Sequence, residues 1–315
     1  MATTRALPYR PVMAKQRKTL TLFDDYYEMM SDRVRVDAYA RAIAQAVQPG
    51  DVVVDLGAGL GLLTLMALRA GAARVYAIEK ADSIELARAV VEHNGLTERV
   101  VFLHGNSKEM FLPERADVLV SETLGSFGID ENTLAFTADA RDRFLKPDGR
   151  MVPERIRPWL APVQSPDGHE RVDFWHDVAG FDYSPALDQQ RGRMSLVTFT
   201  EGDLLAPRQC LADLDLRAVD GDTLARKLLF PIQRPGTLHG LAGWFEADLG
   251  GGGAINTAPE APATHWQQAF FPFLHSIEVV VGDYLEVTLE AGPKADLSDD
   301  TTVRYDYRCT QISKG

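Results

Sequence analysis

A glycine-rich turn at the end of an apolar run contains the first residues whose types and spacing could do chemistry. The run Val54–Leu56 is followed by Gly57, Gly59 and Gly61. Glycines at such a turn let the backbone approach a ligand that a Cβ atom would exclude. Glu79 ends the next apolar run, 20 residues after Gly59, where a carboxylate can accept hydrogen bonds from both hydroxyls of a ribose. The pattern therefore indicates a nucleoside-binding turn.

Asp55, two residues before the first glycine, narrows the choice of ligand. Its charge would repel the oxygens of a pyrophosphate but would stabilise an ammonium group. The dinucleotide-binding pattern G-x-G-x-x-G would also need a glycine at position 62, where this chain has Leu62. A ligand with an amino-acid ammonium, a ribose and no phosphate is S-adenosylmethionine, which we predict as the cofactor. The alternative is an ordinary glycine turn in a doubly wound sheet.

Two glutamates nine residues apart form a second candidate site. Glu122 directly follows the apolar run 117–121, and Glu131 lies beyond Gly125 and Gly128, which could return it to face Glu122. Two close carboxylates repel each other and raise each other's pKa unless a cation lies between them. A planar guanidinium, with five donors in a fixed fork, would satisfy both. The alternative is a surface acidic loop in which Glu131 only caps a following helix, and these residues alone do not decide between the two.

The elements that must position these residues alternate over residues 34–153. Stretches with apolar residues at helical spacing are separated by short apolar runs typical of buried strands. Strands separated by helices pair in parallel with right-handed crossovers, so we predict an open α/β sheet. Its ligand crevice would lie beyond the carboxyl ends of the strands. Helices are expected over 34–47, 62–70 and 83–93, and strands over 52–56, 75–78, 100–103 and 118–120.

The pattern changes after residue 153, where apolar residues alternate with polar ones as in half-buried strands. We predict a β-rich domain over 154–315, a barrel or a sandwich. Within it, segment 164–193 is too apolar for a free loop. Residues 1–33 are expected to be a flexible basic leader, over about the first eighteen residues, and the start of a helix. The apolar residues that alternate with polar ones in the β-rich domain are Leu285, Val287 and Leu289, and also Val303, Tyr305, Tyr307 and Cys309.

The composition excludes several classes of protein. Asp and Glu number 45 against 33 Lys and Arg, for a net charge of −12, which argues against nucleic-acid binding and favours a cationic partner. No apolar run reaches the ~18 residues that would span a bilayer. With only Cys210 and Cys309, no disulfide framework or Cys-rich metal site is available, which suits a reducing compartment. We expect a cytoplasmic protein with no metal site, binding neither nucleic acid nor membrane.

Taken together, these motifs resemble those of the protein arginine methyltransferases, a family of class I S-adenosylmethionine-dependent enzymes. The likeness runs from about Tyr26 to Tyr307, in the family's order. The resemblance implies a Rossmann-like methyltransferase domain, then a barrel-like domain with a dimerisation arm at about 164–193, in a homodimer. The matching segments are EMMSDRVR (28–35), SETLG (121–125) with Glu131 at the family's separation, ARDRFLKPDG (140–149), an arm start between Phe174 and Asp182, and THWQQ (264–268).

The resemblance also implies how the cofactor would be held. On residue type alone, Arg35 would more simply be a solvated charge on a helix. The implied cofactor-binding residues are Arg35 for the carboxylate, Asp55 and the turn with Gly57, Gly59 and Gly61 for the amino-acid end, Glu79 for the ribose, and Ser107 with Lys108 for the adenine.

For the substrate, the resemblance assigns Glu122 and Glu131 to the target guanidinium. His265 with Asp32 would relay the departing proton. On residue type alone, Met29 and His265 would more simply be core residues. The remaining implied substrate-binding residues are Met29 and Trp266 as walls of the pocket, and Thr264.

The chain departs from the family near this site. Segment 123–126 (TLGS) replaces an aromatic-rich stretch, Thr133 replaces a second methionine, and Lys108 stands where an acid is common. These changes leave the size of the substrate and the methylation pattern open.

We therefore predict an N-methyltransferase that moves the methyl group of S-adenosylmethionine directly to a guanidinium nitrogen. Holding two reactants in contact removes much of the entropic barrier to such a transfer. Arginine in a protein is the leading substrate, and free arginine or another guanidine- or amine-containing small molecule is the alternative. A small-molecule methyltransferase without guanidine selectivity, and a noncatalytic dimeric scaffold, are less favoured.

Overall fold

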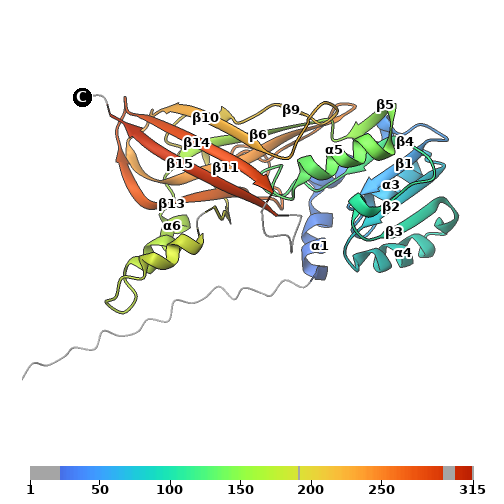
Figure 1. The fold of residues 1–315 in the computed structure, drawn as a ribbon, viewed down its shortest axis with the longest axis horizontal. Coiled ribbons are helices and arrows are strands. Elements are labelled where there is room, and N and C mark those ends of the chain that lie inside the picture. Colours follow the sequence, from blue (N-terminus) through green and yellow to red (C-terminus); the bar gives the residue numbers. More distant parts are fainter. Residues whose placement is uncertain (1–21, 191, 294–301, 314–315) are drawn as a thin grey trace, which may run out of the picture.

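The computed structural model describes residues 22–190, 192–293 and 302–313. They form an α/β part and a β-rich part (Figure 1). The basic leader expected over the first eighteen residues lies outside the described residues. Among those that are described, none of the helices has the length and apolar composition needed to cross a membrane.

The α/β part is a five-stranded parallel sheet in the order β3-β2-β1-β4-β5. Its central strand β1 pairs with β2 on one side and β4 on the other, so the three carboxyl ends that carry the predicted site residues lie next to one another. The predicted open α/β sheet is confirmed. The strands are β1 (Val52–Leu56), β2 (Arg74–Glu79), β3 (Val100–His104), β4 (Ala116–Ser121) and β5 (Leu145–Val152).

The helices of this part form where apolar residues recur at helical spacing. Two of them, α3 (Leu62–Ala70) and α4 (Ser83–His93), coincide with the predicted ranges, and α2 (Arg33–Ala46) begins and ends one residue earlier than expected. The buried face of α2, which includes Tyr39 and Ile43, belongs to the core. Helix α5 (Thr133–Phe144) follows the second glutamate of the candidate site, and α1 (Leu22–Ser31) precedes α2.

The β-rich part consists of two antiparallel sheets, which confirms the predicted barrel-like domain (Figure 1). One sheet has the order β7-β13-β11-β6-β8, with β12 and β9 at its margins, and the other has the order β10-β14-β15. Leu285, Val287 and Leu289 are fully buried, as their alternation predicted, and belong to the same core as residues of β1 and β4. The strands are β6 (Arg155–Val163), β7 (Ser195–Val197), β8 (Gln209–Cys210), β9 (Leu214–Asp215), β10 (Leu224–Pro231), β11 (Gly236–Gly250), β12 (Gly253–Asn256), β13 (Gln268–Val279), β14 (Tyr284–Pro293) and β15 (Val303–Ile312).

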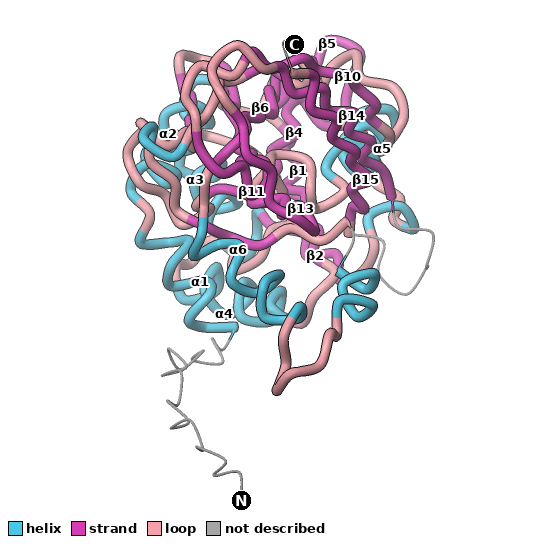
Figure 2. Tube along the Cα trace, turned by 90° about the vertical axis from the view of Figure 1, so that its left-hand side faces the viewer, coloured by secondary structure: helices cyan, strands magenta, loops and turns pink. Residues whose placement is uncertain are grey.

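The segment between β6 and β7 leaves the barrel as an arm, which both views show extending from the body of the described chain (Figure 1, Figure 2). It contains α6 (Pro166–Asp173) and two short 3-10 helices, Phe174–His176 and Ser184–Gln190. Phe174 and Phe181 are 56% and 69% exposed. The arm therefore presents large apolar side chains that nothing in the described chain covers.

Candidate active site

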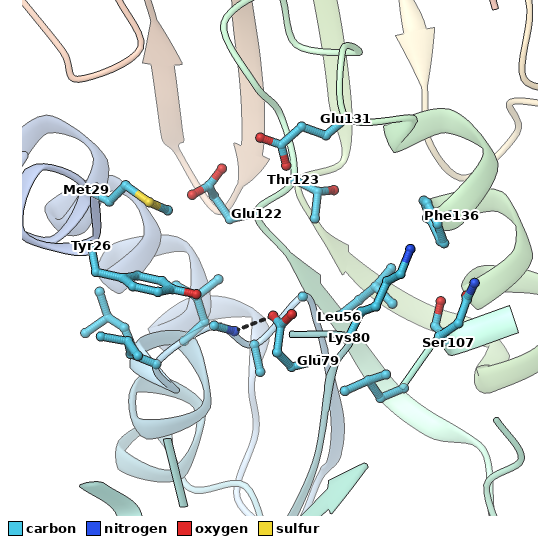
Figure 3. Close-up of a pocket in the computed structure, with 18 of the residues that line it drawn as sticks. Tyr26, Met29, Leu56, Glu79, Lys80, Ser107, Glu122, Thr123, Glu131 and Phe136 are labelled. Atoms are coloured by element: carbon cyan, nitrogen blue, oxygen red, sulfur yellow. Dashed lines mark hydrogen bonds between the residues drawn. The ribbon is translucent and has the colours of Figure 1, made fainter. Parts of the chain in front are cut away.

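A cavity of about 260 Å³ opens at the carboxyl ends of β1, β2 and β4 (Figure 3). It is flanked by α1, which comes before the sheet in sequence, and by the start of α5, which precedes the last strand. Of the residues expected to bind cofactor or substrate, the lining includes Met29, Arg35, Gly57, Gly59, Glu79, Ser107, Glu122 and Glu131.

The glycine turn forms one wall of this cavity. Gly57 has a φ of +76°, and a Cβ atom added there would lie 2.9 Å from Cγ2 of Thr123, so neither the backbone nor the space admits a side chain. Gly59 N–H donates to Oε2 of Glu79 at 2.9 Å, and Ala81 N–H donates to Oε1 at 2.7 Å. Backbone donors thus fix the Glu79 carboxylate at the edge of the cavity (Figure 3).

Asp55 does not reach the cavity. Its carboxylate is fully buried below the turn, where Oδ2 accepts a 2.6 Å hydrogen bond from the Thr64 hydroxyl and Oδ1 has no partner. Burial raises the pKa of Asp55 to about 6, although the hydrogen bonds from Thr64 lower it. Asp55 is therefore bonded to the helix that follows the turn and is not part of the cavity lining, where a residue in direct contact with the amino-acid end was expected. Gly61, at the N-terminus of α3, likewise lies behind the lining.

The part of the cavity lined by Ser107 and Phe136 has the features needed to hold an adenosine. The Ser107 hydroxyl is buried without a partner and lines the cavity together with Phe136 and Leu56. Lys108 is not part of this lining, and its ammonium lies over the Phe136 ring, 4.5 Å from the ring centroid. The Ser107 hydroxyl can bond to a heteroatom of the adenine, and the Phe136 ring offers it a flat apolar wall. The Glu79 carboxylate can accept hydrogen bonds from the ribose of S-adenosylmethionine. The residues present fit that cofactor.

Glu122 stands at the end of β4, in contact with Arg35 of α2. Its Oε2 accepts from Arg35 Nε at 2.7 Å, and both side chains are less than a tenth exposed. Arg35 Nη1 also donates to the carbonyl of Met29 at 3.2 Å. Burial lowers the pKa of Arg35, but the charge and hydrogen bond of Glu122, together with Tyr39 and Asp32, raise it overall. Arg35 therefore stays a cation, and its contacts with Glu122 involve Oε2 and not Oε1.

Glu131 extends into the cavity from the loop before α5, and its carboxylate lies near that of Glu122 (Figure 3). The surrounding protein and the nearby Glu122, Asp130 and Glu79 charges raise the pKa of Glu131 to about 8. The loop brings the two glutamates to one place, as their spacing suggested, and does not leave Glu131 as a simple helix cap. A cation between the two carboxylates would relieve their repulsion.

His265 and Asp32 form a pair outside the cavity lining. Asp32 Oδ2 accepts from His265 N–H at 3.0 Å and lies 2.9 Å from its Nδ1, while Oδ1 accepts from Arg35 N–H at 3.1 Å. Burial raises the pKa of Asp32, but the hydrogen bonds from His265 and Arg35 lower it overall. Both residues line a separate hollow with Thr264. The geometry therefore makes Asp32 the cap of α2, tying the start of the helix that carries Arg35 to the barrel.

Trp266 is a core residue and not a wall of the cavity. It is 4% exposed and packs edge-on against Phe245, with ring centroids 5.2 Å apart. Its side chain belongs to the apolar core and is not part of the cavity lining, where it was expected. Thr264 also lies away from the main cavity.

Several lining residues were not identified from the sequence as site residues. Tyr26 lies three residues before the expected Met29 on α1 and also faces the cavity, a helical spacing that could have indicated a shared face. Phe136 and Lys80 also line it, and the sequence holds no specific signal for them. No group of His, Cys, Asp or Glu side chains within the described ranges is arranged to hold a metal ion.

Comparisons with known proteins agree with this geometry. A family profile described as the arginine methyltransferase oligomerization subdomain matches residues 158–312, and one described as ribosomal protein L11 methyltransferase matches residues 39–152. Protein arginine N-methyltransferase 1 of Schizosaccharomyces pombe is 33% identical over 276 residues, covering 84% of this chain and 81% of the relative. Its counterpart from Saccharomyces cerevisiae is 30% identical over 292 residues, covering 89% and 84%.

Solved structures of the same fold cover nearly the whole chain. Arabidopsis thaliana protein arginine methyltransferase 10, whose structure is described as uniquely open, has a TM-score of 0.73 at 25% identity, covering 93% of this chain and 99% of that one. The Trypanosoma brucei PRMT1 enzyme-prozyme heterotetrameric complex with AdoHcy has a TM-score of 0.79 at 22% identity, covering 91% and 98%. The second likeness concerns the fold alone.

Proposed function

This chain belongs to the protein arginine N-methyltransferase family, and from that premise we propose that its cavity methylates a terminal nitrogen of a protein-bound arginine. The observation that carries the proposal is the pair Glu122 and Glu131, two carboxylates that share one cavity with the glycine turn. S-adenosylmethionine, when bound, supplies an electrophilic methyl group on a sulfonium. The relatives' names support protein arginine as the substrate.

The two glutamates bind and orient the guanidinium. Glu122 is held by Arg35, so its free oxygen has a fixed position before the substrate arrives, and preorganised charge of this kind costs no rearrangement during the reaction. Together the carboxylates would draw the positive charge of the guanidinium toward the nitrogens they bind. The lone pair of the remaining terminal nitrogen would then be more available for attack.

Glu131 is also the group best placed to take the proton that the methylated nitrogen gives up. Binding of the guanidinium would leave Glu131 as an anion, and a carboxylate anion in the same cavity can accept that proton. This replaces the relay expected of His265 and Asp32, whose side chains line a different hollow. In the proposal, that pair holds the start of α2 and, through it, Arg35.

The source of the guanidinium is tested with matched substrates. Purified enzyme and labelled S-adenosylmethionine are incubated with a basic arginine-containing peptide, with the same peptide carrying lysine for arginine, and with free arginine. Label on the arginine peptide alone supports the proposal. Label on free arginine alone would make the protein a small-molecule guanidine methyltransferase, and no label on any of them would contradict both.

The arm is proposed to make the protein a homodimer. Its exposed Phe174 and Phe181 need a partner surface, because contiguous exposed apolar groups on soluble proteins mark interaction sites, and the matching profile is named for oligomerisation. Sedimentation velocity at micromolar concentration should show a dimer for the wild type and a monomer for Phe174→Asp with Phe181→Asp. Leu229→Asp, an exposed apolar position on β10, is the control. A wild-type monomer would contradict the proposal.

A further inference from the structure

Asp130, next to Glu131 in the sequence, points its carboxylate away from the cavity and back into its own loop. Oδ2 accepts from Ser126 N–H at 2.9 Å, and Oδ1 accepts from Phe127 N–H at 2.8 Å. Both oxygens are thus committed to backbone donors of the segment that joins Glu122 to Glu131. The carboxylate closes the loop from within.

The loop is wrapped tightly around this carboxylate. Gly125 has a φ of +58°, and a Cβ atom added there would lie 2.4 Å from Cγ of Asp130. No side chain larger than hydrogen fits at position 125 while Asp130 keeps its place. The Asp130 carboxylate therefore fixes the path of the chain after Glu122, and a change in that path would displace the carboxylate.

The same loop is also fixed to the barrel. The Phe127 ring packs edge-on against Phe271 and Tyr305, with centroids 5.2 Å and 5.8 Å away. Val303 N–H donates to the Asp130 carbonyl at 3.3 Å, so β15 contacts the residue that precedes Glu131. Asp130 thus connects the barrel wall to one of the two glutamates in the cavity.

The charge of Asp130 acts on Glu131 as well. Burial raises the pKa of Asp130 to about 6, although four backbone N–H groups lower it, so the group is anionic at neutral pH. It is one of the charges that raise the pKa of Glu131. The other titratable groups facing Glu131 are Glu122 from the end of β4, Glu79 from β2, Arg35 from α2 and Tyr26 from α1, while Tyr305 of β15 faces Asp130.

We propose that Asp130 is a positioning residue for methyl transfer, which holds the loop so that Glu131 faces Glu122. Its negative charge also acts on Glu131, after burial and the charge of Glu122. The inference rests on the proposed function only in assigning Glu131 to the guanidinium. Asp130 itself touches neither cavity nor substrate. A purely structural role would instead make it one more stabiliser of a turn.

The test compares Asp130→Asn with Asp117→Asn. Asp117 also accepts a backbone N–H, from Val52 at 3.0 Å, and lies at the far end of β4, so its variant reports the cost of losing a structural aspartate. Asp130→Asn removes the negative charge and replaces one of the two side-chain oxygens that accept from the Ser126 and Phe127 N–H groups. We expect kcat/KM for the arginine peptide to fall about tenfold, the size of one lost hydrogen bond to a charged group, while the AdoHcy dissociation constant changes less than about threefold.

The pH profile separates positioning from stability. In Asp130→Asn the midpoint of the rise in kcat/KM with pH should move down, because a neighbouring negative charge has been removed. In Asp117→Asn the midpoint should not move, even if the melting temperature falls equally. Superimposable profiles of Asp130→Asn and wild type, with kcat/KM no lower than in Asp117→Asn, would overturn the inference.

A direct titration makes the result independent of activity. The Glu131 carboxyl resonance is followed by carbon-13 NMR and assigned with Glu131→Gln. Its midpoint should be lower in Asp130→Asn than in wild type, and an unchanged midpoint refutes the inference even if no substrate is methylated. If Asp130→Asn does not fold, Asp130→Ser, which keeps one acceptor without charge, takes its place. An inactive wild type with a shifted midpoint would reject the proposed function and retain the inference.

Discussion

Arg35 and Glu122 are 87 residues apart in sequence, yet they form a buried ion pair at the edge of the cavity, with Arg35 Nε 2.7 Å from Glu122 Oε2. Arg35 belongs to α2 and Glu122 follows β4, so packing of α2 against the sheet creates the pair. One oxygen of Glu122 is thereby occupied and the other is available. The pair links the residue expected to hold the cofactor to one proposed to bind the guanidinium.

Replacing Glu122 by Gln should separate catalysis from cofactor binding. The variant keeps the shape of the side chain but loses the charge that binds the guanidinium, so turnover should fall about 100-fold or more. Its affinity for AdoHcy, measured by titration calorimetry, should stay within about threefold of wild type. Glu98→Gln, an exposed position on the 3-10 helix before β3, is the control. Turnover near that of the control would contradict the assignment of Glu122.

Arg35→Ala should weaken cofactor binding, which Glu122→Gln is expected to leave nearly unchanged. It removes the proposed partner of the cofactor carboxylate and leaves Glu122 buried without its cation, which is strongly unfavourable. The AdoHcy dissociation constant should rise at least about tenfold. Arg35→Lys restores a charge but not the planar fork that contacts both Glu122 and the Met29 carbonyl, so it should recover only part of the loss. Wild-type affinity in both variants would argue against Arg35 as a cofactor ligand.

The pH dependence of kcat/KM should report Glu131. With a pKa raised to about 8, Glu131 is mostly protonated at pH 6.5 and becomes the anion that binds a guanidinium only as the pH rises. Activity at low substrate should therefore increase up to tenfold per pH unit below about 8 and level off above it. Glu131→Gln should be slower and lose this limb of the profile. A wild-type profile that is flat between pH 6.5 and 9 would be inconsistent with a titrating Glu131.

Gly57→Ala should block the cofactor without unfolding the protein. The new Cβ would meet the Thr123 side chain at 2.9 Å in a backbone conformation with a φ of +76°, and relief would require the turn to move into the cavity. We expect at least a tenfold weaker AdoHcy affinity and a loss of stability of roughly 1–2 kcal/mol. Gly221→Ala is the matched control, because Gly221 also has a positive φ but open space around it. Equal AdoHcy affinities of the two variants would contradict this role of the turn.

Local patterns in the sequence were sufficient for much of this fold. The glycine turn, Glu79 and the strand that delivers Glu122 follow from a short-range alternation of strands and helices, because a parallel sheet places consecutive carboxyl ends together. The alternation of Leu285, Val287 and Leu289 likewise predicted the buried face of β14 correctly. These features depend on neighbours in sequence.

The features that the sequence did not reveal depend on contacts between distant segments. The pairing of Arg35 with Glu122 requires α2 to pack on the sheet, and the burial of Trp266 depends on how the barrel closes around Phe245. The role of Asp130 needs the path of the loop around it. Asp55 was expected to contact the cofactor, and its depth below the turn could not be derived from spacing.

The central claim is that a guanidinium binds between Glu122 and Glu131, and proton release on binding tests it most directly. Calorimetric titration of AdoHcy-loaded enzyme with an arginine peptide at pH 7, in buffers of different ionisation enthalpy, measures the protons released. Because the pKa of Glu131 is about 8, wild type should release nearly one proton per peptide bound, and Glu131→Gln should release almost none and bind more weakly. Equal affinity of the two proteins with no proton release from wild type would contradict the claim.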